Sequence, residues 1–446
     1  MKARSVMSSV QRPPALFLHS AFRSGSTWFW NRFRKAAGTC AYYEPFNEVL
    51  ASLDPQMVAD HRPDTWPAGH PALDAPYYAE YAPLLRPDGG VRGYQRRFAY
   101  QSYFDDGRDE DQLRYFALLT DHAGRSGLVP VLGFCRSLAR LPWLRRHCPG
   151  LHLVTWRNPW DQWASYHHLA LSHQSSYFEF RAFLIASFGR CHERYRDFFA
   201  DLYLPPLLAY TSGDNEAFLD FFFRASHVDH RFRIFLRVFM FDMLNALPHA
   251  DVVVDLDRMS AEAPYRQAMT ESLRIRTGLP DLRFDDCALP RHGWLDDGAY
   301  LSGLDDALDF LGDWEKRASA AGIGPAAIDD LKGRLTQCRN DMAAAARAGG
   351  TSGELVPGQS DLDRYTLCQV LFAIGLMVRP GGSPEDGLAH LRSVFGADFC
   401  SLRDDLLRAL DLVEGLSEPS RQETQRLAAR QLGRMLTGEE VGPQGI

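Results

Sequence analysis

The chain has 446 residues, of which 46% are hydrophobic and 12% aromatic, and its formal net charge is −7. This composition can bury a full core, and the length suits two or three domains at roughly 100–200 residues each. The acidic balance gives no indication of nucleic-acid binding. The eight cysteines include no Cys-x-x-Cys pair and no Cys/His cluster at metal-ligand spacing, which predicts reduced thiols and no metal site.

The sequence contains neither a predicted signal peptide nor a predicted membrane-spanning segment. Residues 1–18 lack the basic segment followed by a long apolar run that a signal peptide needs. The most apolar later stretch, 233–247, carries Arg237 and Asp242 and is too short to cross a bilayer. We therefore expect a cytoplasmic protein with no transmembrane segment.

The first predicted unit is a strand, a turn and a helix. Residues 15–22 form a short apolar run that ends in small residues. Residues 26–37 then repeat large apolar side chains at helical spacing, and Gly38 is predicted as the C-cap.

Further strand and helix signals alternate along the chain. Apolar runs predict strands at 129–134, 151–156 and within 250–259, and helical patterns predict helices at 137–147 and from about residue 160. The segment 176–247 reads as helical, and a helix is predicted over 265–278. Continuous apolar strands alternating with helices favour an α/β fold with a parallel sheet covered on both faces.

The last quarter of the chain differs in composition. Residues 341–360 are small and glycine-rich, which is typical of a linker, and 361–446 carry amphipathic helical patterns without a chemical motif. We therefore predict a domain at 1–340, a linker at 341–360 and an all-helical C-terminal region at 361–446 that could support a homodimer.

The turn "FRSGSTW" between the first strand and helix is suited to an anion. Ser24, Gly25, Ser26 and Thr27 would present successive backbone N–H groups at a helix N-terminus, where the helix dipole favours negative charge. The Walker pattern is absent, because no lysine follows the glycine, and the dinucleotide fingerprint is absent too. The turn alone is also compatible with a plain strand-to-helix connection.

A second motif, "RNPWDQWAS", begins at the end of the strand at 151–156 and enters the next helix. Its Arg157 and Ser165 could jointly hold another phosphate. The two motifs together resemble those of sulfotransferases that use 3′-phosphoadenosine 5′-phosphosulfate (PAPS), over roughly residues 14–300. The resemblance implies a P-loop-like three-layer fold and transfer of a sulfuryl group to a hydroxyl acceptor, with 3′,5′-ADP as product and no metal requirement.

Residue roles follow from this resemblance. The amides of Ser24 to Thr27, with the Ser26 and Thr27 hydroxyls, would hold the 5′-phosphate, and Trp28 would stack on the adenine. Arg157 and Ser165 would hold the 3′-phosphate that distinguishes PAPS from ATP. Arg23, at a position where carbohydrate and tyrosylprotein sulfotransferases have arginine, would contact the bridging oxygen or the sulfonate. A surface ion pair is the alternative for Arg23.

The catalytic base is expected on a different loop. Cytosolic sulfotransferases have a histidine near the position of Cys135, and this sequence has none there. "YYEPFNE" instead places Glu44 about twenty residues after the first motif, similar to the Tyr-Glu-Pro of carbohydrate sulfotransferases. Glu44 is the predicted base, with Glu48 as the fallback and a solvated loop carboxylate as the alternative. Arg136 is a candidate for stabilising the transferring sulfonate, or a surface residue.

Other conspicuous residues are assigned weaker roles. His167 and His168 are expected to pack rather than to catalyse. The segment 291–303 is a distant substitute for the late glycine-rich segment of cytosolic sulfotransferases. Tyrosines and Trp66 within 66–104 could line an acceptor groove or pack in the core.

The resemblance also implies a class of acceptor. The "RSGST" and "YEP" stretches favour a glycan, a glycolipid or a glycosylated metabolite, and a phenolic or peptide acceptor is the alternative. A small-molecule kinase would need a lysine and a Mg²⁺ carboxylate near the loop. A binding protein that retains only the nucleotide cradle is the non-enzymatic alternative.

Overall fold

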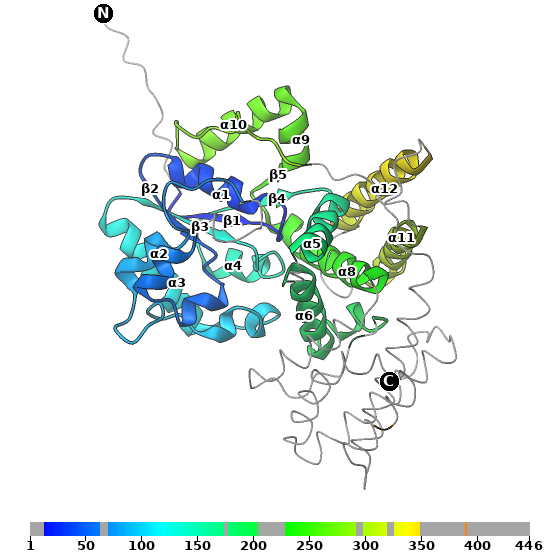
Figure 1. Cartoon of the computed structure of the whole chain (residues 1–446), viewed down its shortest axis with the longest axis horizontal. Coiled ribbons are helices and arrows are strands. Elements are labelled where there is room, and N and C mark those ends of the chain that lie inside the picture. Colours follow the sequence, from blue (N-terminus) through cyan, green and yellow to red (C-terminus); the bar gives the residue numbers. More distant parts are fainter. Residues whose placement is uncertain are drawn as a thin grey trace, which may run out of the picture. The chain divides into compact units, whose positions relative to one another are not determined.

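The fold is organised around a parallel β-sheet (Figure 1). The computed structural model describes residues 13–62, 70–173, 177–202, 204, 228–290, 298–318, 325–347 and 389. The strands are β1 (Leu16–His19), β2 (Thr39–Tyr43), β3 (Val129–Phe134), β4 (Leu151–Trp156) and β5 (Val252–Asp255). The helices are α1 (Ser26–Lys35), α2 (Pro55–Asp60), α3 (Glu110–Arg125), α4 (Leu141–His147), α5 (Pro159–His173), α6 (Tyr177–Cys191), α8 (Val228–Ala246), α9 (Leu256–Ala261), α10 (Ala263–Thr277), α11 (Gly298–Ala318) and α12 (Pro325–Arg347). Short 3₁₀ segments are η1 (Glu48–Ala51), η3 (Ala79–Leu84), η4 (Arg96–Phe98), η5 (Gln101–Tyr103), η6 (Arg196–Phe198) and η7 (Leu247–His249).

The described residues divide into two compact units. The first lies within Met1–Ser176, Phe239–Gly293 and Leu308–Asp341, and the second within Tyr177–Val238, Trp294–Ala307 and Met342–Ile446. The sheet and every predicted site residue belong to the first unit, so the site can be described within that unit alone.

The five strands run in the order β2-β3-β1-β4-β5, and all neighbouring pairs are parallel. Leu16 of β1 lies opposite Val131 on one side and Leu151 on the other, which makes β1 the central strand. The predicted α/β class with a parallel sheet is confirmed. The expected strands at 129–134 and 151–156 have the observed bounds, and β2 is a strand that the sequence analysis did not predict.

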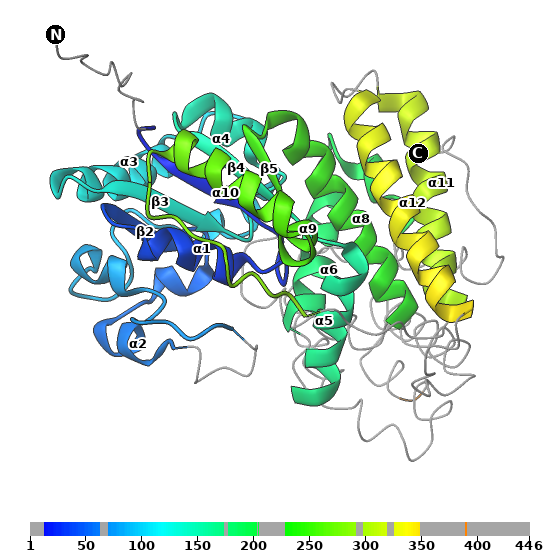
Figure 2. The same ribbon diagram turned by 90° about the horizontal axis from the view of Figure 1, so that it is seen from above.

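Helices lie around the sheet (Figure 2), and alternating side chains of β1 pack on its opposite faces. Leu16 and Leu18 join a cluster with α1 and α10, and Phe17 joins a separate cluster with α3 and α4. Because successive strand residues point to opposite faces, the apolar run "LFLH" requires cover on both. The result is a three-layer arrangement of helices, sheet and helices.

The connections after β1 and β3 leave these adjacent strands toward opposite faces. The loop after β1 leads to α1, and the turn after β3 leads to α4, whose side chains belong to the other cluster. In open parallel sheets, such a reversal leaves a crevice at the carboxyl ends of the strands, where ligands bind. Both sequence motifs follow strands at this edge of the sheet.

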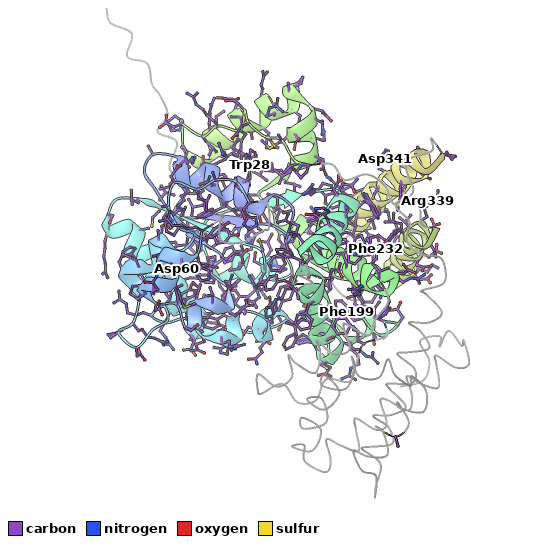
Figure 3. The ribbon with its side chains drawn as sticks, in the orientation of Figure 1. Trp28, Asp60, Phe199, Phe232, Arg339 and Asp341 are labelled. Carbon is purple, nitrogen blue, oxygen red and sulfur yellow. The ribbon has the colours of Figure 1, made fainter. Side chains whose placement is uncertain are left out.

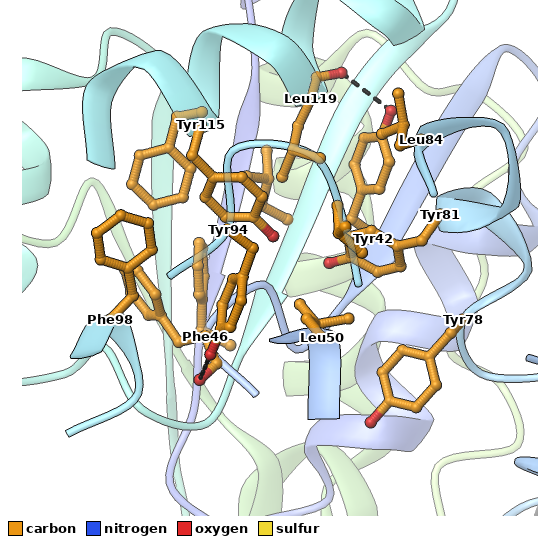
Figure 4. Close-up of a cluster of buried hydrophobic side chains, with 14 of the residues drawn as sticks. Tyr42, Phe46, Leu50, Tyr78, Tyr81, Leu84, Tyr94, Phe98, Tyr115 and Leu119 are labelled. Carbon is orange, nitrogen blue, oxygen red and sulfur yellow. Dashed lines mark hydrogen bonds between the residues drawn. The ribbon is translucent and has the colours of Figure 1, made fainter. Parts of the chain in front are cut away.

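The tyrosine-rich segment supplies packing rather than a groove (Figure 4). Tyr42 and Tyr94 donate hydrogen bonds to the carbonyl oxygens of Leu119 and Phe46, at 2.9 and 3.3 Å. Six tyrosines of the predicted acceptor wall are buried, and Trp66 lies outside the described residues. The buried ones are Tyr77, Tyr78, Tyr81, Tyr94, Tyr100 and Tyr103.

Several predicted boundaries are wrong. Helix α1 ends at Lys35 with Ala36 as its C-cap, and Gly38 lies in the following turn with φ 81°. Helix α4 starts at Leu141 rather than 137, because the residues before it form a turn. Helix α12 continues to Arg347, seven residues into the expected linker at 341–360.

Apart from residue 389, the expected helical region at 361–446 lies outside the described residues. Within the part of the chain that the structure describes, we find no helix both long enough and apolar enough to cross a bilayer.

Candidate functional site

The loop between β1 and α1 forms a cradle of backbone N–H groups. Gly25 is the N-cap of α1 with φ 92°, and the first intrahelical bond is from the Phe29 N–H to the Gly25 carbonyl at 3.0 Å. The N–H groups of residues 26–28 therefore have no acceptor within the helix. This positive φ favours glycine, and a Cβ at Gly25 would also come 2.9 Å from a methyl carbon of Leu289, so the Leu289 side chain would have to shift.

The second motif meets the first at this cradle. The Nε of Arg23 donates to the Ser165 hydroxyl at 2.9 Å, and Nη1 of Arg157 donates to the Arg23 carbonyl at 2.7 Å. Nη2 of Arg157 donates to the Pro290 carbonyl at 2.5 Å. Three of the predicted site residues, Arg23, Arg157 and Ser165, are therefore brought together after β1, after β4 and on α5, although Arg23 and Ser165 are 142 positions apart.

Two cations lie together here, of which Arg157 is buried and Arg23 is partly buried. The pKa of the Arg23 guanidinium is lowered to about 10, first by burial and then by the charge of Arg157. Burial also lowers the pKa of Arg157, which Asp161 and Asp257 oppose. The Nε of Arg157 is buried and donates to no acceptor in the described residues. An anion beside these groups would relieve both the repulsion and the unmet donor.

The hydroxyls of α1 contact the neighbouring strands. Sγ of Cys135 lies 3.1 Å from the Ser26 hydroxyl oxygen. The Thr27 hydroxyl shares a 2.8 Å hydrogen bond with the Tyr43 hydroxyl. The sequence analysis missed Tyr43, because a tyrosine at the end of an unpredicted edge strand gives no signal of its direction.

Glu44 follows β2 directly and is buried, with only 4% of its side chain exposed. Its N–H donates to the Gly133 carbonyl at 2.7 Å, and its carboxylate accepts from Nη1 of Arg136 at 2.7 Å. A small pocket is lined by Ser20, Ser26, Trp30, Tyr43, Glu44 and Cys135, together with backbone and apolar side chains of β1 and β3. The alternative of a solvated loop carboxylate is therefore wrong.

Arg136 is fully buried, so its surface role is also wrong. Its guanidinium donates to Glu44, to Glu48 at 2.8 Å and, through Nε, to the Tyr100 hydroxyl at 2.9 Å. It also lies over the ring of Phe22, with 4.9 Å from Cζ to the ring centroid. These contacts place Arg136 beside the candidate base.

The environment of Glu44 shifts its pKa in opposing directions. Burial raises the pKa, the Arg136 guanidinium lowers it, and hydrogen bonds from Cys135 lower it as well. Burial raises the pKa of the Cys135 thiol well above its usual range, and the Glu44 carboxylate adds to this. Cys135 is therefore a neutral hydrogen-bond donor at this site rather than a thiolate nucleophile.

Trp28 lies on the first turn of α1 (Figure 3). Its ring is tilted against Phe284 at 5.8 Å between centroids, and the Arg32 guanidinium lies 5.6 Å from its ring centroid. The side chain is partly exposed. The predicted adenine contact stays a prediction.

Two side chains of helix α5 that the sequence analysis did not select donate hydrogen bonds to the loop after β1. Gln162 and Tyr166 each donate to the Phe22 carbonyl at 3.3 Å. Their spacing of four residues places them on one helix face, which is the only sequence signal that could have found them. His167 stacks on Trp163 at 5.9 Å, as a packing residue should.

A tyrosine and a histidine lie close enough to Arg23 to interact with its charge. Tyr77 stacks on Tyr43 at 4.9 Å, and His70 Nδ1 lies 2.6 Å from the Tyr77 hydroxyl. Burial lowers the pKa of His70 to about 3, and the Arg23 charge contributes. His70 is therefore neutral at this site.

The described residues contain no group of three or more His, Cys, Asp or Glu side chains that could hold a metal ion. Residues 291–297 of the segment 291–303, the distant substitute for a glycine-rich nucleotide segment, lie outside the described residues.

Comparison with known proteins adds no relative. No protein-family model matches this chain, and neither do any curated protein or solved structure.

Proposed function

We propose that this protein is a PAPS-dependent sulfotransferase that acts on a hydroxyl acceptor. The observation that carries the proposal is the meeting of the two motifs: Arg23 contacts Ser165, and Arg157 contacts the Arg23 carbonyl. A donor with phosphate groups at both its 5′ and 3′ positions needs two anion sites next to each other. A P-loop-like arrangement of the loop after β1 is part of this proposal.

The chemistry of the site suits that donor. Free N–H groups at the start of α1 and the helix dipole favour the 5′-phosphosulfate. The buried Nε of Arg157, which donates to no described acceptor, suits the 3′-phosphate together with Ser165. Two adjacent guanidinium groups would favour a ligand with several negative charges over a neutral one.

The chain's own residues provide for in-line transfer. Glu44 accepts the proton from the acceptor hydroxyl as the acceptor oxygen bonds to sulfur. Arg23 stabilises the charge that builds on the bridging oxygen as the S–O bond to the 5′-phosphate breaks. The electron pair of that bond leaves with 3′,5′-ADP. Arg136 holds Glu44 in place, and a direct contact between Arg136 and the sulfonate is the alternative.

The acceptor class follows from the resemblance of the motifs rather than from a groove. Because the tyrosines at 77–103 pack in the core, they supply no argument for a sugar-binding wall. A glycan, glycolipid or glycosylated metabolite stays the proposed acceptor, with a phenolic or peptide hydroxyl as the alternative. A cytoplasmic location is part of the same proposal.

Donor binding tests the proposal first. We expect 3′,5′-ADP to raise the melting temperature without Mg²⁺, and ATP and AMP at the same concentration to raise it far less. Native-state binding at a hundred times Kd stabilises by about 2.7 kcal/mol. Equal shifts from ATP and 3′,5′-ADP would contradict the assignment. Incubation with radiolabelled PAPS and fractionated host extract would then identify the acceptor.

A further inference from the structure

One guanidinium holds two carboxylates beside the proposed base. Nη1 of Arg136 donates to Glu44 at 2.7 Å, and Nη2 donates to Glu48 at 2.8 Å. The exposed fractions of the side chains are 1% for Arg136, 4% for Glu44 and 22% for Glu48. A buried cation therefore connects a buried carboxylate to one that reaches solvent.

A buried ion pair by itself would be a poor base. If Glu44 were the sole partner of Arg136, its protonation would leave an uncompensated buried cation, which is strongly unfavourable. The second carboxylate removes this difficulty. After Glu44 becomes neutral, Arg136 still has Glu48 as a charged partner.

We propose that Glu48 is a positioning residue that keeps Arg136 neutralised while Glu44 takes the acceptor proton. This rests on the proposed function. In the transfer step, the acceptor oxygen bonds to sulfur and its proton moves to Glu44. The S–O bond to the 5′-phosphate breaks, and its electron pair leaves with 3′,5′-ADP. The Arg136–Glu48 pair persists throughout the step.

The groups that face Glu44 come from three further parts of the fold. Tyr43 precedes it on β2, Cys135 and Arg136 follow β3, and Glu48 begins η1. Burial raises the pKa of Glu44, Arg136 and Cys135 lower it, and the charge of Glu48 raises it. Without the Glu48 charge, Glu44 is the one charged partner of these two carboxylates that Arg136 keeps. The pKa of Glu44 should therefore fall, which makes Glu44 a weaker base.

The pH dependence of turnover tests this role. Glu48→Gln should move the acid limb of the kcat profile to lower pH by about one pH unit and reduce the plateau rate by about three- to tenfold. Glu48→Asp, which keeps the charge, should restore the acid limb. Affinity for 3′,5′-ADP should be the same in both variants. An unshifted acid limb in Glu48→Gln would overturn the proposal.

A second measurement is independent of turnover. The free energy of unfolding is measured against pH for the wild type, Glu44→Gln, Glu48→Gln and the double variant. Because the folded pKa of Glu44 is raised relative to that of an isolated carboxyl, the stability linked to its protonation is present at low pH and is lost as pH rises through the folded pKa. With Glu48 replaced, the folded pKa of Glu44 is lower, so this loss should be smaller and should be complete at lower pH.

The outcomes separate the two proposals. Coupling between Glu44 and Glu48 in the unfolding cycle without any transfer from PAPS would contradict the proposed function and leave the shared ion pair intact. Transfer from PAPS without coupling in either measurement would overturn the role of Glu48 alone. If Glu48→Gln does not fold, Glu48→Ala, which removes the same charge, is used in place of Glu48→Gln in both measurements.

Discussion

Two residues of the site have a backbone conformation that is rare outside glycine. Of the residues that the structure describes, Arg23 and Glu44 are the non-glycine ones with positive φ, at 57° and 48°. This region costs a side-chain-bearing residue roughly 1–2 kcal/mol. Strained residues of this kind gather at functional sites, where the surroundings hold them. Here both residues belong to the proposed chemistry. Their backbone conformation was not used to choose them, so it supports the same site independently.

The strain at Glu44 gives a stability prediction. The free energy of unfolding of Glu44→Gly should be about 1 kcal/mol higher than that of Glu44→Ala, because glycine relieves the strain while both variants lose the carboxylate. Urea denaturation of the purified variants measures this. At Glu48, which has no positive φ, the same pair should show the reverse order. Greater stability of Glu44→Ala than of Glu44→Gly would show that the conformation is not kept in solution.

Glu44→Gln tests the chemical role of the same residue. The substitution keeps the shape and removes the basicity, so 3′,5′-ADP affinity should survive while the chemical step slows by about 10²–10⁴-fold. Single-turnover rates and nucleotide affinity are measured on the same preparation. Near-wild-type chemistry would exclude Glu44 as the base and leave Glu48 as the next candidate.

Arg157 combines a structural and a binding role. Arg157→Ala should weaken 3′,5′-ADP binding by about 10- to 150-fold, the equivalent of the roughly 1.5–3 kcal/mol lost with a charge-assisted contact. It should also lower the free energy of unfolding, since two of its nitrogens donate to the Arg23 and Pro290 carbonyls. Calorimetric titration measures the affinity. Arg145→Ala, on a half-exposed arginine paired with Asp251, is the control and should bind normally. Unchanged affinity in Arg157→Ala would reduce the motif to a structural turn.

At the scale of elements, β1, β3 and β4 are connected by a buried hydrogen-bond chain. His19 Nδ1 lies 2.7 Å from the Ser137 hydroxyl, His19 Nε2 lies 3.1 Å from His152 Nδ1, and His152 Nε2 lies 3.1 Å from the Cys148 carbonyl. Because a carbonyl only accepts, His152 must carry its proton on Nε2. The direction of the whole chain follows: His19 donates to His152, and Ser137 donates to His19. These hydrogen bonds hold the turn that contains Cys135 and Arg136.

Acid should weaken this connection. Burial lowers the pKa of His152 to about 4 and lowers that of His19 well below its usual range, so both are neutral in the folded protein. The unfolded chain binds these protons from about pH 6.5 downward. Stability linked to the two histidines is therefore lost as pH falls from 6.5 toward 4, by up to about 1.4 kcal/mol per pH unit for each.

His152→Phe should make this pH dependence shallower, whatever its effect on absolute stability. The measurement is the free energy of unfolding between pH 4 and 7. His168→Gln, at an exposed position, is the matched control and should keep the wild-type slope. An unchanged slope in His152→Phe would show that His152 is not held neutral.

Sequence patterns predicted elements unequally, for physical reasons. The runs "VPVLGF" and "LHLVTW" are buried on both faces and flanked by Pro, Gly or a turn, so β3 and β4 were predicted with their observed bounds. The edge strand β2 is five residues long and continues into "EPFNE", which masks its pattern. Gly38 lies in the turn between α1 and β2 and is not the C-cap of α1. A glycine with positive φ suits either position, so only the observed path of the chain distinguishes them.

At the scale of the whole molecule, the site belongs to the first compact unit alone. The second unit contains the described part of the chain beyond Asp341. Deletion of 361–446 should therefore leave 3′,5′-ADP binding intact, and calorimetry on the truncated protein measures it. The full-length protein in the same buffer is the control. A truncated protein that is folded and soluble but does not bind would show that the C-terminal region contributes to the donor site.

The sequence by itself determined the alternation of strands and helices, the parallel sheet and the two motifs at strand ends, since these depend on local periodicity and turn chemistry. Only the tertiary structure decided which polar groups meet. It brought Ser165 to Arg23, and it placed Glu44 and Glu48 on one guanidinium. Such contacts join residues far apart in the chain, and their geometry depends on strand order and on which face each connection takes. No local pattern contains that information.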